Sequence, residues 1–345
     1  MTSQISRRSF VYAAAVGAPA ILGAQDKAGT KRPILGEGEH RYEAIHDWGE
    51  LPSHIRFGNT HGVVGDSQGH IYIEHTVNAT SQSADTIVVF DEKGKFVTSW
   101  GKQFKGGAHG LYIRKEGSTE YLYICDHLHG MVTKRTLKGE EVFTLGYPAE
   151  SEAYKIAADR SRPVYRPTNL AVAANGDVYV GDGYGSSYIN QYNSQAQYIR
   201  TFGGLGKELG QLSTPHGIWM DTRAPEPVLQ VADRSNHRIQ TFSLDGKPLA
   251  VSGGVKSPCY FHQRGDMLVV PDLSARVTLL DRNNQVIIHL GDGGDGWREL
   301  RTKERSAFIP GQFICPHGAW FDRDGDIFVA EYVEVGRVTK LRKLS

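Results

Sequence analysis

The sequence is poor in cysteine and in net charge. Its 345 residues include 3 cysteines, without the C-x-x-C spacing of zinc ribbons or redox motifs, so we expect no disulfide framework and no such metal module. With 39 basic and 38 acidic residues, the chain has no charge excess that would predict a nucleic-acid or membrane-surface partner. Beyond one short N-terminal run, no apolar stretch approaches the length of a membrane span. We therefore expect a mature protein that does not insert into membranes.

Glycine, by contrast, is abundant. The chain has 40 glycines, about 12% of its residues against a typical ~7%. The strict G-x-y period of collagen is absent, and 39% of the residues are hydrophobic, which is enough for a core. The glycines are therefore expected to mark many tight turns in a folded protein.

The first residues read as a targeting signal. Residues 6–11, which contain Arg7 and Arg8, closely match a twin-arginine export signal, and a short apolar run with Ala24 as the cleavage position follows. We assign residues 1–24 to the signal peptide, 25–40 to a linker and 41–345 to the folded domain. This predicts a periplasmic or secreted protein. The alternative is a chance arginine pair before an ordinary buried helix.

The rest of the sequence repeats one unit six times. Each unit has a short opening motif, a β-branched or aromatic strand that ends in an acidic residue, a second strand, a glycine turn and a closing strand. Units of roughly 40–60 residues with this pattern are typical of four-stranded blades in a ring. We predict an all-β, six-bladed β-propeller of the NHL-repeat type, in which residues 41–48 complete the last blade. The acidic residues that end these strands are Glu74, Asp126, Asp182, Asp233, Asp272 and Glu331.

The opening motifs contain the candidate metal ligands. The innermost strand of a blade starts near one mouth of the central channel, so one residue of each opener is expected there. Three histidines in units two, four and six would lie roughly 120° apart around one axis, which suits a catalytic divalent metal with one open position. Read in order, the six opener positions are His61, His109, Thr168, His216, Pro258 and His317.

A structural alternative remains open for these histidines. They could be repeat-consensus residues that cap each innermost strand through hydrogen bonds. His61 occupies the same position in unit one and breaks the threefold pattern, so it could be a fourth ligand, a hydrogen-bond donor to a ligand or a relic of the repeat.

Two segments resemble the lyase domain of peptidylglycine α-amidating enzymes, within a resemblance to NHL-repeat propellers over residues 45–343. One segment is Thr-Pro-His-Gly at 214–217 together with residues 231–242, and the other is residues 178–189. In that family a propeller-bound zinc is held by three histidines, and the reaction cleaves peptidyl-α-hydroxyglycine to a peptide amide and glyoxylate. The resemblance therefore implies zinc at His109, His216 and His317, Tyr184 acting at the metal, and Arg234 holding the substrate.

These residue types suit that chemistry. Zinc would polarise the substrate hydroxyl, a tyrosine next to the metal could act as base, and an arginine could neutralise a carboxylate. The alternatives are that Tyr184 is an ordinary blade-edge aromatic and that Arg234 and Arg238 pair with acids such as Asp233 on a solvated loop.

The sequence also departs from the family pattern. The family has an arginine in its first blade, but no arginine occurs here between Phe57 and Ile113. The family's structural calcium uses two backbone carbonyls, matching Val63 and Leu111, and an acid directly after the third zinc ligand. That position is Gly318 here, which argues against calcium. The metal triad is thus better supported than the specific amidating reaction.

Two function classes follow. The first is an exported metal-dependent enzyme acting on a small polar or peptide-derived substrate. The second is a non-catalytic propeller that binds a protein, peptide or glycan on one face. Inserts at residues 146–166 and 292–310 are placed to shape a pocket, and His127 and His129 are interpreted as part of a solvated loop.

Overall fold

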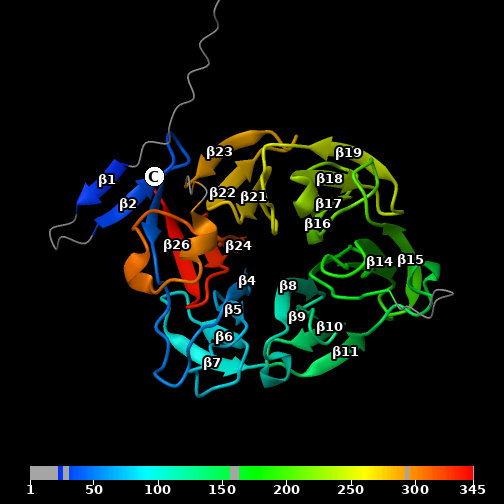
Figure 1. Cartoon of the computed structure of the whole chain (residues 1–345), viewed down its shortest axis with the longest axis horizontal. Coiled ribbons are helices and arrows are strands. Elements are labelled where there is room, and N and C mark those ends of the chain that lie inside the picture. The colour runs from blue at the N-terminus through cyan, green and yellow to red at the C-terminus, as the bar shows by residue number, and fades with distance from the viewer. Residues whose placement is uncertain (1–21, 26–30, 156–162, 292–293, 295, 345) are drawn as a thin grey trace, which may run out of the picture.

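The chain folds into six antiparallel sheets arranged around one centre (Figure 1). This computed structural model describes residues 22–25, 31–155, 163–291, 294 and 296–344. Each sheet corresponds to one sequence unit, and neighbouring strands within a sheet follow each other along the chain except where β3 pairs with β26. The predicted all-β, six-bladed propeller is therefore confirmed.

The first three blades have four strands each, ordered from the centre to the rim (Figure 1). Blade one consists of β4 (Thr60–Gly65), β5 (Ile71–His75), β6 (Ile87–Phe90) and β7 (Phe96–Trp100). Blade two consists of β8 (Ala108–Glu116), β9 (Thr119–Asp126), β10 (Met131–Thr136) and β11 (Glu141–Leu145). Blade three consists of β12 (Asn169–Val172), β13 (Val178–Gly181), β14 (Tyr188–Tyr192) and β15 (Tyr198–Gly203).

The last three blades repeat this order, and the sixth is extended. Blade four consists of β16 (Pro215–Asp221), β17 (Val228–Asp233), β18 (Arg238–Phe242) and β19 (Pro248–Ser252). Blade five consists of β20 (His262–Arg264), β21 (Met267–Asp272), β22 (Arg276–Leu280) and β23 (Val286–Leu290). Blade six consists of β24 (Pro316–Phe321), β25 (Ile327–Glu331), β26 (Arg337–Lys343), β3 (Tyr42–Ile45), β2 (Lys31–Leu35) and β1 (Leu22–Gln25).

The two ends of the described chain meet in blade six. Strand β3 pairs antiparallel with β26, with Ala44 opposite Leu341, so an N-terminal strand closes the ring as predicted. Strand β2, within the segment assigned as a linker, pairs with β3. Residues 22–24 of the predicted signal peptide lie in β1, and residues 1–21 lie outside the described residues.

Short helical turns lie between strands. They are η1 (Lys102–Phe104), η2 (Glu152–Tyr154), η3 (Arg234–Asn236), α1 (Trp297–Leu300) and η4 (Arg305–Ala307). Within the described part of the chain, no helix has the length and apolar character needed to cross a membrane.

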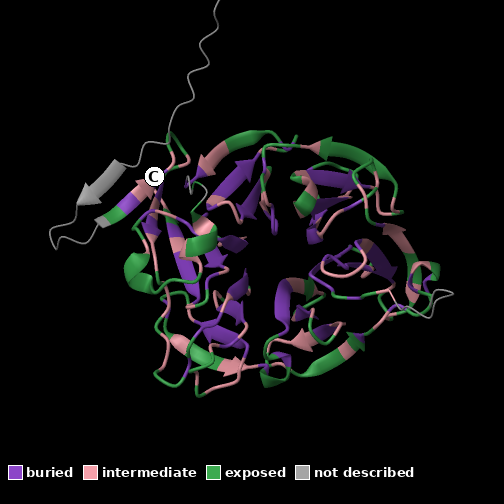
Figure 2. Ribbon diagram, viewed as in Figure 1, coloured by how far each residue is buried: buried purple, intermediate pink, exposed green. Residues whose placement is uncertain are grey.

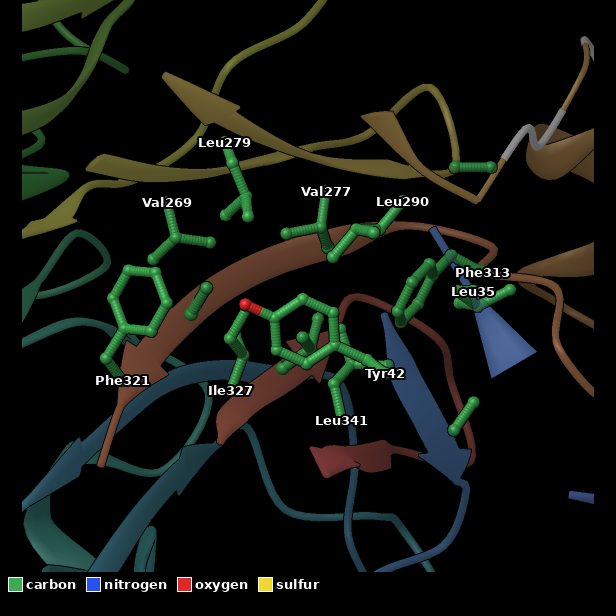
Figure 3. Close-up of a cluster of buried hydrophobic side chains, with 14 residues drawn as sticks. Leu35, Tyr42, Val269, Val277, Leu279, Leu290, Phe313, Phe321, Ile327 and Leu341 are labelled. Carbon is green, nitrogen blue, oxygen red and sulfur yellow. The ribbon is translucent and has the colours of Figure 1, made fainter. Parts of the chain in front are cut away.

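The core lies between neighbouring blades. Inner strands such as β5 are buried along their whole length, whereas the outer strand β19 is largely exposed (Figure 2). Between blades five and six, Val277 and Leu279 pack in one cluster with Ile327 and Leu341 (Figure 3). Burial of one such side chain contributes about 1.5–3 kcal/mol, so blade-to-blade packing is the main force that holds the ring.

The acids at the strand ends fix the loop that leads into the opener of their own blade. The backbone N–H of Ser213, for example, donates to Asp233 at 2.6 Å. Four of the six predicted acids end their strand as expected, and Asp182 directly follows β13. Blade one differs by one residue, because His75 pairs with Thr60 and its Nδ1 accepts the N–H groups of Gly58 and Val77. His75 therefore replaces the acid there, and the prediction for Glu74 was wrong.

Candidate metal centre

Three of the predicted ligands come together at the centre of the ring. His109, His216 and His317 are the second residues of β8, β16 and β24, and all three are buried. The ring centroids are 4.8 Å apart for His109 and His216, 4.8 Å for His109 and His317, and 4.7 Å for His216 and His317. The three imidazoles therefore form a nearly equilateral triangle.

A β-bulge turns each of these side chains toward the centre. The register shifts between Ala108 and Gly110 in blade two, and the same irregularity occurs at the openers of blades four and six. A bulge inserts an extra residue and redirects its side chain. His109 and His317 are the inserted residues in blades two and six, and His216 lies with Gly217 in the shifted stretch of blade four, so each histidine leaves the alternation of its strand.

Each histidine of the triad is held by a backbone carbonyl from the next blade. A carbonyl oxygen only accepts hydrogen bonds, so the ring proton must be on Nδ1 and the Nε2 lone pair is free. Metal-ligating histidines are commonly oriented through their other nitrogen in this way. The pairs are His109 Nδ1 with Thr168 O at 2.8 Å, His216 Nδ1 with Cys259 O at 2.8 Å and His317 Nδ1 with His61 O at 3.0 Å.

The glycine after each triad histidine makes this contact possible. A Cβ atom at Gly217 would lie 2.5 Å from the Cys259 oxygen, and one at Gly318 would lie 2.5 Å from the His61 oxygen. Gly110 faces the Thr168 oxygen in the same way. The His-Gly pairs of the sequence thus let the next blade approach closely enough to orient the imidazole.

Tyr184 lies against two corners of the triangle. Its hydroxyl oxygen is 3.0 Å from His109 Nε2 and 3.0 Å from His216 Nε2. Both nitrogens can only accept, and the hydroxyl has one proton, so it cannot satisfy both. A cation bound among these atoms would satisfy all of them, and the donor set of imidazole nitrogens therefore fits a divalent metal such as zinc.

The triad is electrically suited to bind a cation. Burial holds the pKa of His109 and of His216 well below its ordinary value and lowers the pKa of His317 to about 3. The rings are therefore neutral near pH 7. The neutral form is the one that ligates metals.

Arg234 belongs to the site and Arg238 does not. The Arg234 guanidinium donates to the Tyr184 hydroxyl at 3.3 Å and lies 5.2 Å from the centre of the Tyr184 ring. Burial raises the pKa of Tyr184, and the charge of Arg234 acts in the opposite direction. Arg238 instead pairs with Asp233 at 2.7 Å, as the structural alternative held.

The odd-numbered blades contribute different groups. His61 Nδ1 lies 3.3 Å from His317 Nε2, so it can donate to that lone pair. In blade five, the prediction that Pro258 lines the channel was wrong. Pro258 pairs with Asp272 in the same way as Pro215 pairs with Asp233 in blade four. Cys259 therefore occupies the position that a triad histidine has in the even-numbered blades. In the described residues, His61, His109 and His317 offer ligand atoms within 4.8 Å of one another, and so do His216, Cys259 and His317.

His127 also lies at the site, although we predicted that it would belong to a solvated loop. Its ring lies 5.5 Å from His109 and 5.5 Å from Tyr184, whereas His129 turns back to pair with Asp126 at 2.6 Å. The position of His127 in its repeat could have revealed this role. Like Arg234 and Tyr332, His127 directly follows the acid that ends the second strand of its blade, and all three residues lie at the centre of the ring.

The calcium arrangement implied by the family resemblance does not fit this chain. Gly318 offers no carboxylate and has no room for one. The carbonyl of Leu111, one of the two expected ligands, accepts the Tyr260 hydroxyl at 3.1 Å. Glu74 is buried nearby with both carboxylate oxygens unpartnered, and burial raises its pKa well above the ordinary value, which favours the neutral acid.

Comparisons with known proteins find sequence similarity to peptidylglycine α-amidating enzymes. No family model matches the chain. Peptidyl-alpha-hydroxyglycine alpha-amidating lyase 1 of Drosophila melanogaster is 26% identical over 81% of this chain and 56% of its own length. Peptidyl-glycine alpha-amidating monooxygenase of Mus musculus is 31% identical over 65% of this chain and 24% of its own length. The chain thus spans about half of the fly protein and a quarter of the mouse protein.

Solved structures agree on the fold. A streptogramin B lyase superposes with a TM-score of 0.57 at 13% identity, covering 89% of this chain and 99% of that one. Virginiamycin B lyase from Staphylococcus aureus gives a TM-score of 0.54 at 13% identity, covering 88% of this chain and 100% of that one. The chain is an NHL-like propeller that resembles the amidating-lyase domain.

Proposed function

We propose that this protein is an exported, zinc-dependent lyase that cleaves peptidyl-α-hydroxyglycine or a closely related hydroxylated carboxylate adduct. The proposal rests on one observation above all. Three buried imidazoles are each oriented through Nδ1 by a carbonyl, and the Nε2 atoms of His109 and His216 meet at the Tyr184 hydroxyl. The lyase named among the relatives supplies the reaction class.

The chain's own residues account for the required steps. Zinc held by His109, His216 and His317 would act as a Lewis acid toward the substrate hydroxyl. Tyr184 would take the hydroxyl proton as the C–N bond breaks, so that the new C=O belongs to glyoxylate and the electron pair goes to the departing amide nitrogen. That nitrogen then takes a proton, which Tyr184 is placed to return. Arg234 favours the ionised form of Tyr184 through its charge.

Hydrogen bonding to the backbone alone would not require this arrangement. A capping role explains the Nδ1 contacts, but it gives no reason for the Nε2 lone pairs of His109 and His216 to face one tyrosine hydroxyl in a buried site. Buried polar atoms without partners are costly. We therefore favour the enzyme over a propeller that binds a protein, peptide or glycan on one face.

The activity is tested with purified protein and an N-acyl-α-hydroxyglycine. Zinc-loaded protein is expected to release glyoxylate, and chelator-treated protein is expected to lose that activity and regain it when zinc is returned. Stoichiometric metal without glyoxylate release would refute the named reaction, and absence of bound metal would favour the non-catalytic alternative.

Export is proposed from the twin-arginine motif at Arg7 and Arg8. The periplasmic or secreted fraction should contain the wild-type protein, and replacement of both arginines by lysine should retain it in the cell. Equal distribution of the two forms would overturn this assignment.

A further inference from the structure

We propose that Arg301 is a specificity-determining residue that binds the anionic group of the substrate at the edge of the metal centre. It comes from the insert between blades five and six, which the repeat pattern does not explain. The identity of the anion, a carboxylate, rests on the proposed function. The position and chemistry of Arg301 do not.

The insert is held firmly over this side of the ring. Trp297 and Leu300 of α1 pack with the cluster of Ile314, Cys315 and Val333. The carbonyl of Arg301 also accepts the backbone N–H of Glu334 at 2.9 Å. These contacts fix the backbone from which the Arg301 side chain extends.

The guanidinium lies one aromatic ring away from the histidines. It stacks on Tyr332, 4.1 Å from the ring centre, and the Tyr332 ring is 5.2 Å from His61 and 6.0 Å from His317. Its NH2 group also donates to Asn59 Oδ1 at 3.3 Å, next to the opener of blade one. Stacking leaves the edge of a guanidinium free for a planar carboxylate.

The positive charge of Arg301 is not matched by an acid. Among the residues that the structure describes, no carboxylate lies within ion-pair distance of Arg301, and its buried Nε has no hydrogen-bond partner. Two neighbours differ. Arg337 pairs with Glu331 at 2.5 Å, and Arg305 contacts Asp47 and two backbone carbonyls. A partly buried cation with an unused donor is expected to bind an anion.

Arg234 and Arg301 lie on different sides of the centre. The Arg234 guanidinium is engaged with the Tyr184 hydroxyl and ring on the blade-four side. Arg301 lies near His61 and His317, on the side of blades one and six. A substrate at the metal centre would therefore have its proton acceptor and Arg234 on one side and Arg301 on the other.

The test compares Arg301→Gln with the matched control Arg298→Gln. Arg298 is an exposed arginine of α1, the helix that Arg301 directly follows, and it stacks on Trp297. Calorimetry on the metal-loaded protein would measure binding of N-benzoylglycine, which has a carboxylate, and of its neutral carboxamide. Arg301→Gln should weaken carboxylate binding at least about tenfold and leave carboxamide binding unchanged. Arg298→Gln should match wild type for both ligands, and Arg301→Lys should recover part of the loss.

The outcomes separate this inference from the proposed reaction. If wild type releases no glyoxylate but shows the carboxylate-specific loss in Arg301→Gln, the reaction fails and the anion site stands. If both ligands weaken equally, or neither binds wild type, or Arg301→Gln binds like wild type, the inference is overturned. Should Arg301→Gln not fold, the same contrast in Arg301→Lys decides, because that variant keeps the charge and loses the planar fork. With an active enzyme, the KM for the hydroxyglycine substrate should rise about tenfold in Arg301→Gln while kcat changes little.

Discussion

Even-numbered and odd-numbered blades have the same strands but contribute different atoms to the centre. Blades two, four and six supply imidazole side chains, whereas blades three, five and one supply the carbonyls that orient them. The side chain at the odd position can vary, because Thr168, Cys259 and His61 each take part in this contact only through a backbone oxygen, which accepts the Nδ1–H. A ring of six similar blades thus has a site of threefold symmetry, because only every second blade supplies a triad histidine. His61 of blade one is not equivalent to these three histidines.

The largest effect on activity is expected from Tyr184→Phe, which removes the hydroxyl that touches two even-blade histidines. We expect kcat for glyoxylate release to fall about 100- to 10,000-fold, the range typical of a lost acid–base group. Bound metal should stay stoichiometric, because the triad is untouched. Unchanged kcat would remove Tyr184 from the mechanism, and loss of the metal would make it a ligand instead.

A smaller effect on metal binding is expected from Gly217→Ala, which should push the Cys259 carbonyl of blade five away from blade four. The added Cβ would meet the Cys259 oxygen at 2.5 Å and push it away from His216 Nδ1. We expect the free energy of unfolding to fall by about 1–3 kcal/mol and metal affinity to fall about 10- to 100-fold. Gly253→Ala is the matched control in the same blade, because a Cβ there has no neighbour within 4 Å. Equal behaviour of the two variants would refute the orienting role.

The smallest effect is expected from Cys259→Ala. It removes the thiol at an odd position and keeps the carbonyl that holds His216. Metal content and kcat should match wild type, with the free energy of unfolding reduced by about 1 kcal/mol for the lost buried sulfur. A large loss of metal would show that the thiol itself is a ligand, as its place beside His216 and His317 permits.

Much of the fold could be predicted because each blade is a local unit whose sequence pattern occurs six times along the chain. The strand-ending acids, the glycine turns and the His-Gly pairs are short-range patterns, so they locate the blades, the ring closure and the three histidines. At two positions the predicted residue was one place away from the residue that the structure shows. His75 takes the place of a blade acid, and Cys259 takes the place assigned to Pro258, because register depends on pairing with the next strand.

The rest of the site depends on contacts that no local pattern records. Arg301 reaches the centre through an insert outside the repeat, and its stacking on Tyr332 is a long-range contact. The orientation of the triad depends on backbone carbonyls from the next blade. Every residue has a backbone carbonyl, so the amino-acid type does not reveal this contact. His127 was recoverable only by comparing the residues that follow the strand-ending acids across all blades.

The central claim is that one metal is held by the even-blade histidines and not by His61. The most direct measurement is bound metal per chain, by mass spectrometry after equilibration with equimolar zinc, for wild type, His216→Ala, His61→Ala and the exposed control His54→Ala. We predict one zinc in wild type, His61→Ala and His54→Ala. In His216→Ala the affinity for zinc should fall more than about 100-fold, which exceeds the loss expected when only a residue that orients a ligand is removed. This variant should therefore be largely metal-free. No zinc in wild type, or full zinc in His216→Ala with loss in His61→Ala, would contradict the account.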